Sequence, residues 1–234
     1  MHNGENLNSN RRRRVVAAVF ALTIAGTLTA CTPAEKSGTD AAETRPSTPA
    51  VKTFGPDGYG KLTIGITEKD ALATGDLQNA PVSTVLGRKV YSFVDGPKPD
   101  AGRMAADEKI EKAVEKAKAG GSDKSAKELA DDAQAYADST KRLSERLTAF
   151  LSAGGAGFVE GELNTIAAPE GAATEAGIKR GSSEAELKAA YEGKGLKPEG
   201  KTAFVLPLAG HSGWIILFDM DGGTVRYMSL GGPN

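Results

Sequence analysis

The sequence predicts an α+β protein made of two tandem helix-plus-antiparallel-sheet units, the first of which is interrupted by an inserted α-helical hairpin. Three observations support this fold class. A helix-start motif occurs twice, short runs rich in Val, Ile, Leu and aromatic residues follow each copy, and residues 97–155 are dense in Ala, Glu, Lys and Asp. These patterns favour short helices, antiparallel strands and a helical hairpin, respectively.

The repeated motif marks the start of a short helix in each unit. Residues 61–71 align with residues 177–187, and the alignment places Thr67 on Ser183. A hydroxyl at the position before a helix accepts a hydrogen bond from a free amide of the first turn. Ser183 also begins a capping box, because a glutamate follows it three residues later. The expected helices span residues 68–74 and 184–191.

Three short strands are expected after each helix. In the second unit they are separated by Gly-containing turns at residues 209–213 and 220–223, which are typical of hairpins. Pro207 predicts that the first of these strands lies at a sheet edge or carries a bulge, because proline cannot donate to a neighbouring strand. The expected strands span residues 89–94, 157–160, 162–167, 202–208, 214–219 and 225–230.

The first unit, residues 55–168, carries the helical hairpin at residues 97–155, with helices expected over 103–119 and 125–151. Apolar and small residues of the second helix recur at spacings of four and three, which predicts a narrow coiled-coil seam. We expect this seam to pack on the thin apolar face of the first helix; the alternative is that the hairpin contacts a partner protein. The seam residues are Leu129, Ala133, Tyr136, Thr140, Leu143, Leu147 and Phe150, and the facing residues are Met104, Ile110, Val114 and Ala117.

The N-terminal residues have the pattern of a bacterial export signal. A block of four arginines precedes an uncharged run at residues 15–30, and Leu28-Thr29-Ala30-Cys31 follows the order of a lipobox. We therefore expect residues 1–30 to be a signal peptide and Cys31 to be the lipidation site. Two acyl chains make such an anchor stable, so the mature protein is expected on the extracytoplasmic face of the cell membrane.

Beyond Cys31 the chain is expected to divide into a tether and the two units. Residues 31–54 are rich in Pro, Thr, Ala and charge, and this composition predicts a disordered segment. The second unit is expected at residues 169–234.

Composition excludes several kinds of chemistry. The chain carries a net charge of −1 and residues 1–30 carry +3, from four arginines and one glutamate, which leaves −4 on the remainder. A mildly acidic protein is not expected to bind nucleic acid. His211 is the one histidine beyond residue 30 and Cys31 the one cysteine of the chain, so neither a metal site nor a cofactor is expected.

These observations favour a non-enzymatic module that binds another protein of the cell envelope through its sheet face or its hairpin. The alternative is a cell-wall or lipid-directed hydrolase that uses His211 and nearby carboxylates. A small-ligand carrier would need a deep pocket between the units, and two small units leave little room for one.

The signal, the lipobox, the tether and the two motifs at residues 59–67 and 176–184 together resemble the uncharacterised secreted lipoproteins of Streptomyces-type actinobacteria. The motif, its short acidic helix and the strands after it are also similar to the tandem units of the β-lactamase inhibitor protein and of the small outer-membrane-assembly lipoproteins. This resemblance implies the two-unit fold over residues 56–96 and 156–234. We transfer no inhibitory residue, because that inhibitor is stabilised by disulfides and Cys31 has no cysteine to pair with in this chain.

Overall fold

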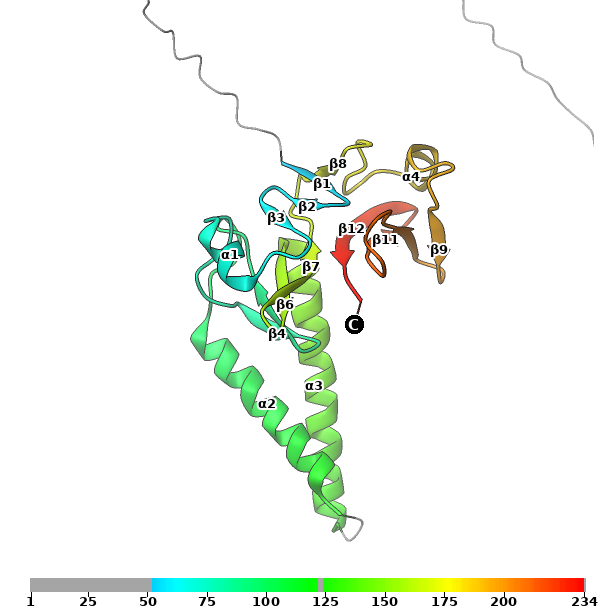
Figure 1. Cartoon of the computed structure of the whole chain (residues 1–234). Helices are drawn as coiled ribbons and strands as arrows, with labels where there is room; N and C mark the ends of the chain where they lie inside the picture. Colours follow the sequence, from blue (N-terminus) through cyan, green and yellow to red (C-terminus); the bar gives the residue numbers. More distant parts are fainter. Residues whose placement is uncertain (1–51, 122–123, 234) are drawn as a thin grey trace, which may run out of the picture. The chain divides into compact units, whose positions relative to one another are not determined.

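The computed structural model describes residues 52–121 and 124–233, and these residues confirm the α+β class (Figure 1). The expected signal peptide, Cys31 and most of the expected tether lie outside the described residues. The described residues belong to one compact unit. The two expected units are therefore not separate bodies, because strands from both join in one continuous sheet.

Eight strands form the main sheet, in the order β4-β5-β6-β7-β12-β11-β10-β9, and all neighbours are antiparallel. The junction between the two halves is the pairing of β7 with β12, where Leu230 lies opposite Ile166. The strands are β4 (Ser83–Val85), β5 (Arg88–Tyr91), β6 (Gly155–Val159), β7 (Glu162–Ala167), β9 (Lys197–Glu199), β10 (Ala203–Pro207), β11 (Ile215–Asp221) and β12 (Thr224–Gly231).

The expectation of three strands after each of the two short helices is wrong, because four strands of the main sheet follow each one. The missed strands are β4 and β9, the two edges of the sheet. Val85 is the one buried residue of β4, and β9 is exposed throughout. Such short edge strands lack the apolar alternation from which a strand is predicted.

The expected place of Pro207 is also wrong. β10 lies inside the sheet, between β9 and β11, and no bulge interrupts it. β9 pairs with β10 only as far as Val205, so Pro207 lies beyond the end of its neighbour. The sheet therefore loses no hydrogen bond at the proline.

A second, small sheet was not expected. Its order is β3-β2-β1-β8, and β1 pairs with β8 in parallel. β1 begins at Thr53, within the range expected for the tether, because the Phe54 side chain is completely buried in the core. The strands are β1 (Thr53–Gly55), β2 (Gly58–Tyr59), β3 (Leu62–Thr63) and β8 (Ala173–Thr174).

The two short helices, α1 (Glu68–Ala73) and α4 (Glu184–Ala190), begin where the motif predicts. The hydroxyl of Thr67 accepts from the Asp70 amide at 3.1 Å, and the full capping box at Ser183 is present. Each helix also begins against a hairpin turn: the Glu68 amide donates to the carbonyl of Gly161 at 2.8 Å. In the other half, the Glu184 amide donates in the same way to Gly223 at 2.9 Å.

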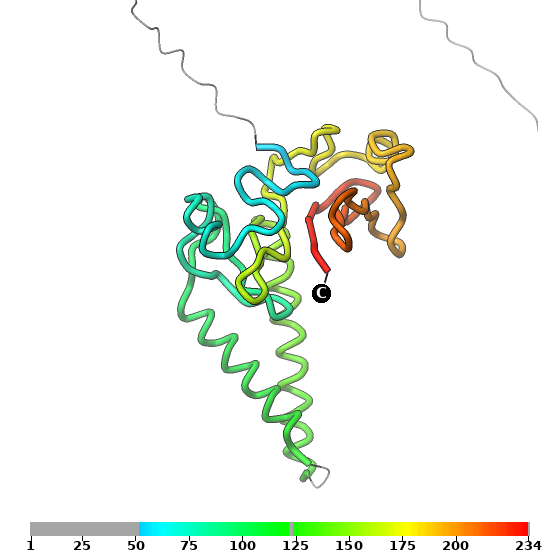
Figure 2. Tube along the Cα trace, viewed as in Figure 1, coloured from blue at the N-terminus to red at the C-terminus, as the bar shows by residue number. Residues whose placement is uncertain are grey.

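The helical hairpin consists of α2 (Ala101–Ala119) and α3 (Ala126–Ala153), which lie side by side (Figures 1 and 2). The expected seam is present on α2 and absent on α3. On α2, Val114 and Ala117 are buried and Met104 and Ile110 are half-buried, whereas Leu129, Tyr136 and Leu147 of α3 are exposed. Ion pairs also join the two helices: Asp107 meets Arg142 at 2.7 Å and Glu111 meets Arg146 at 2.7 Å. Successive residues are about 100° apart around a helix. The apolar residues of α3 therefore lie on a face that is rotated by roughly a quarter turn from the face that carries Arg142 and Arg146.

Candidate functional site

An exposed apolar surface runs along α3, and we call it the α3 stripe. Its large residues are Leu129, Tyr136 and Leu147, whose exposed fractions are 56%, 42% and 36%. Ala133 and Thr140 lie between them and are also exposed. The Thr140 hydroxyl donates to the Tyr136 carbonyl at 2.9 Å, so the helix itself satisfies the hydroxyl of Thr140.

The stripe is bordered on one side by small, uncharged residues. Ala130 and Ala137 directly follow the stripe residues Leu129 and Tyr136, Ser144 lies one heptad further along the helix, and all three are exposed. On its other side lies the face that meets α2, which Lys124 and Asp132 extend toward the tip with a further ion pair. Large residues beside small neutral ones, at heptad spacing, are typical of a helix surface that another helix can approach closely.

The base of α3 is held on the main sheet. Phe150 is buried against Val85, Val90 and Ala167, and Leu143 packs beside them. Leu143 and Phe150 belong to the predicted seam, so the sheet covers these two seam residues and leaves the stripe uncovered.

Arg180 fixes the C-terminal end of α3. Its guanidinium donates to the carbonyls of Leu151 at 2.5 Å, Ser152 at 2.8 Å and Ala168 at 2.6 Å. A cation at this end of a helix also interacts favourably with the helix dipole. Burial lowers the pKa of Arg180, which is consistent with its partly buried position against the Tyr227 ring. Sequence reasoning missed this residue, because Arg180 lies far from α3 in the chain.

The half of the sheet beyond α3 presents a further partly exposed apolar face. Val205, Leu217, Ser229 and Ala167 follow one another across four strands and so share a face of the sheet. Ala167 lies under α3, whereas Val205 and Leu217 are only partly buried and belong to neither core cluster. The α3 stripe and this open sheet face are the surfaces best suited to contact another molecule.

His211 lies in the turn between β10 and β11, at the surface. Its Nε2 atom is 3.5 Å from Oδ1 of Asp57, and the two side chains are 32% and 86% exposed. Among the described residues, no hydroxyl or thiol is hydrogen-bonded to His211. The structure thus brings His211 to one carboxylate and to no nucleophile within the described part of the chain.

Residues 52–121 and 124–233 contain no group of three or more His, Cys, Asp or Glu side chains able to hold a metal ion. None of the described helices combines the length and the apolar character needed to cross a membrane. Cys31, the expected lipidation site, lies outside the described residues.

Comparison of the chain with protein families, with curated proteins and with solved structures gives no match. The resemblance to secreted lipoproteins and to the tandem units of the β-lactamase inhibitor protein stays a prediction. The α3 stripe and the open sheet face are therefore interpreted from their own chemistry.

Proposed function

We propose that this protein is a lipid-anchored lipoprotein of the extracytoplasmic membrane face and that it binds another envelope protein without catalysing a reaction. The α3 stripe carries this proposal. Three large apolar side chains on a helix whose partner α2 contacts a different face remain available for a second helix. The partner is an envelope protein that supplies an amphipathic helix with an uncharged apolar face.

The chemistry of the stripe favours a helix as the partner's contact element. The neutral residues beside it offer no charge to an extended acidic or basic segment, and their small size allows close backbone approach. The open sheet face, with Val205 and Leu217, extends the apolar surface available to the same partner.

Crosslinking in the native envelope tests the binding proposal. The variant Tyr136→Glu places a charge within the stripe without touching the α2 contact, and we expect it to abolish a specific crosslinked product. Gln134→Glu adds the same charge at an exposed position on the other side of α3 and should preserve the product. Equal crosslinking by both variants, or no specific product from the unaltered chain, would contradict the proposal.

Anchoring is tested separately by metabolic labelling with a fatty acid. The unaltered chain should incorporate label and sediment with membranes, whereas Cys31→Ala should lose both properties. A chain that is unlabelled in its native host and keeps residues 1–30 would refute the anchor while leaving the crosslinking result interpretable.

The alternative, a cell-wall or lipid-directed hydrolase, is supported by the contact of His211 with Asp57. It predicts hydrolysis of peptidoglycan or phospholipid that His211→Ala abolishes. Activity that survives this substitution would exclude a role for His211.

A further inference from the structure

A cavity lies between the small sheet, the end of α4 and strands β10 and β11. Its volume is about 440 Å³, within the range of roughly 300–1,000 Å³ that is usual for small-molecule sites. Phe54, Leu206, Leu208 and Ile216 form its apolar wall, and all four are buried in the main core. The expectation that the chain leaves little room for a pocket is therefore wrong, because β1 and β8 build a second layer that the sequence did not reveal.

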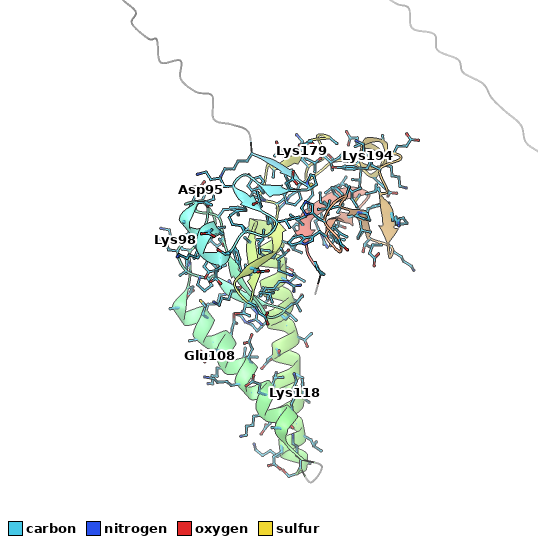
Figure 3. The ribbon with its side chains drawn as sticks, in the orientation of Figure 1. Asp95, Lys98, Glu108, Lys118, Lys179 and Lys194 are labelled. Carbon is cyan, nitrogen blue, oxygen red and sulfur yellow. The ribbon has the colours of Figure 1, made fainter. Side chains whose placement is uncertain are left out.

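Two residues of opposite charge, Lys194 and Glu175, line this cavity together with Tyr191. Lys194 Nζ lies 5.6 Å from the centre of the Tyr191 ring, and Figure 3 labels Lys194 on the segment that follows α4. Burial raises the pKa of Tyr191, and the negative charge of Glu175 raises it further, which places that carboxylate near the same side chain. Lys194 and Glu175 both line the cavity.

Neither charge is neutralised by an ion pair within the described residues. Lys194 and Glu175 are both exposed to solvent at the edge of the cavity. An apolar wall with one free cation and one free anion at its edge complements a molecule that carries an apolar group and both charges.

Two segments that line the cavity are joined by a contact of His211, the histidine that the sequence singled out. Pro56 and Ala209 line the cavity. Asp57 directly follows Pro56, His211 lies two residues after Ala209, and the His211–Asp57 pair links these two segments at 3.5 Å. The β1–β2 turn and the β10–β11 turn therefore lie next to each other beside the cavity.

We propose that this cavity binds a small zwitterion with an apolar side chain, namely a free apolar amino acid or a dipeptide of such residues. The ligand carboxylate pairs with Lys194, its ammonium group pairs with Glu175, and its apolar side chain contacts Leu206 and Ile216. The site is distinct from the α3 stripe, so this proposal is independent of the proposed binding to a partner protein.

Calorimetric titration of the full chain in detergent tests the proposal, with phenylalanine and phenylalanyl-phenylalanine as probes. N-acetylphenylalanine lacks the ammonium group and phenylalanine amide lacks the carboxylate. We expect each capped probe to bind about tenfold or more weakly than phenylalanine, since each loses one charge-assisted contact. The ratio between the two uncapped probes distinguishes an amino-acid site from a dipeptide site.

Variants of Lys194 and Glu175 test which charged group of the ligand each residue binds. Lys194→Met should weaken phenylalanine about tenfold while leaving the affinity for phenylalanine amide nearly unchanged. Glu175→Gln should weaken the binding of phenylalanine to a similar extent and should leave the affinity for N-acetylphenylalanine nearly unchanged. Lys197→Met and Glu199→Gln in the exposed strand β9 are matched controls that should alter nothing. Absence of heat with both uncapped probes, equal affinity for capped and uncapped forms, or unchanged affinity in both cavity variants would overturn the proposal.

Discussion

Asp107 is the residue on which the contact between α2 and α3 most depends. Its side chain is nearly buried and accepts two hydrogen bonds from Arg142, while Arg146 lies 3.9 Å away. Removing one partner of a buried ion pair leaves the other without compensation. Both arginines keep a second carboxylate, Glu145 or Glu111, which limits the loss.

The variant Asp107→Ala is therefore expected to lower the free energy of unfolding by about 2–3 kcal/mol. Its neighbour provides the control: Glu108 is exposed and pairs only with Lys112 along the same helix (labelled Glu108 in Figure 3). Glu108→Ala should leave the free energy of unfolding nearly unchanged, because an exposed ion pair contributes little. Urea unfolding measures both, and amide exchange in α2 should accelerate for Asp107→Ala alone.

Tyr91 gives a pH-dependent contribution at the residue scale. Burial, together with a hydrogen bond to Glu68, raises the pKa of Tyr91 to about 12. The folded chain thus retains the phenolic proton that the unfolded chain releases near pH 10. The contribution of Tyr91 to the free energy of unfolding is fully present below pH 10 and is lost as the pH rises from about 10 to about 12.

We expect Tyr91→Phe to reduce the fall in unfolding free energy between pH 10 and 12 by up to about 2 kcal/mol. The measurement is urea unfolding at pH 8, 10 and 11.5 for both chains. Parallel pH profiles for Tyr91→Phe and the unaltered chain would show that Tyr91 titrates as it does in water.

At the scale of elements, Arg180 connects the hairpin to the second half of the sheet. Replacing Arg180 with Met removes three hydrogen bonds to carbonyls at and near the end of α3 and should cost about 2–3 kcal/mol. Arg226 lies at 5.0 Å from the same Tyr227 ring, but it is about half exposed and pairs with Asp219. Arg226→Met should therefore cost less than about 1 kcal/mol in the same unfolding experiment.

The elements also show what local sequence determines. The N-caps at Thr67 and Ser183 and the approximate lengths of α2 and α3 depend on neighbouring residues, and local sequence patterns located them. The capping box at Ser125 is equally local, but it was not predicted. Which face of α3 meets α2 could not be predicted in this way. Its apolar period indicated a buried face, yet the charges of Asp107, Arg142 and Arg146 select the face that meets α2.

At the scale of the whole molecule, the helical hairpin is an insertion into a sheet whose strand pairing does not depend on it. β5 and β6 are antiparallel neighbours, with Tyr91 opposite Ala156, so a short turn can join them. Replacing residues 97–153 with a Gly/Ser turn should leave the sheet folded. The chain should lose about 2–4 kcal/mol of stability, because Phe150 no longer covers Val85 and Val90. Circular dichroism with urea unfolding checks this, and a chain without strand signal would contradict it.

The sequence by itself determined the α+β class, the starts of the helices and the positions of most strands, because caps, turns and apolar periods act over a few residues. Only the tertiary structure decided that β7 pairs with β12, that β1 and β8 form a second sheet, and that the stripe from Leu129 to Leu147 stays exposed. These features depend on contacts between segments far apart in the chain. Local patterns specify which residues are apolar, whereas the packing of distant segments decides which of them are covered.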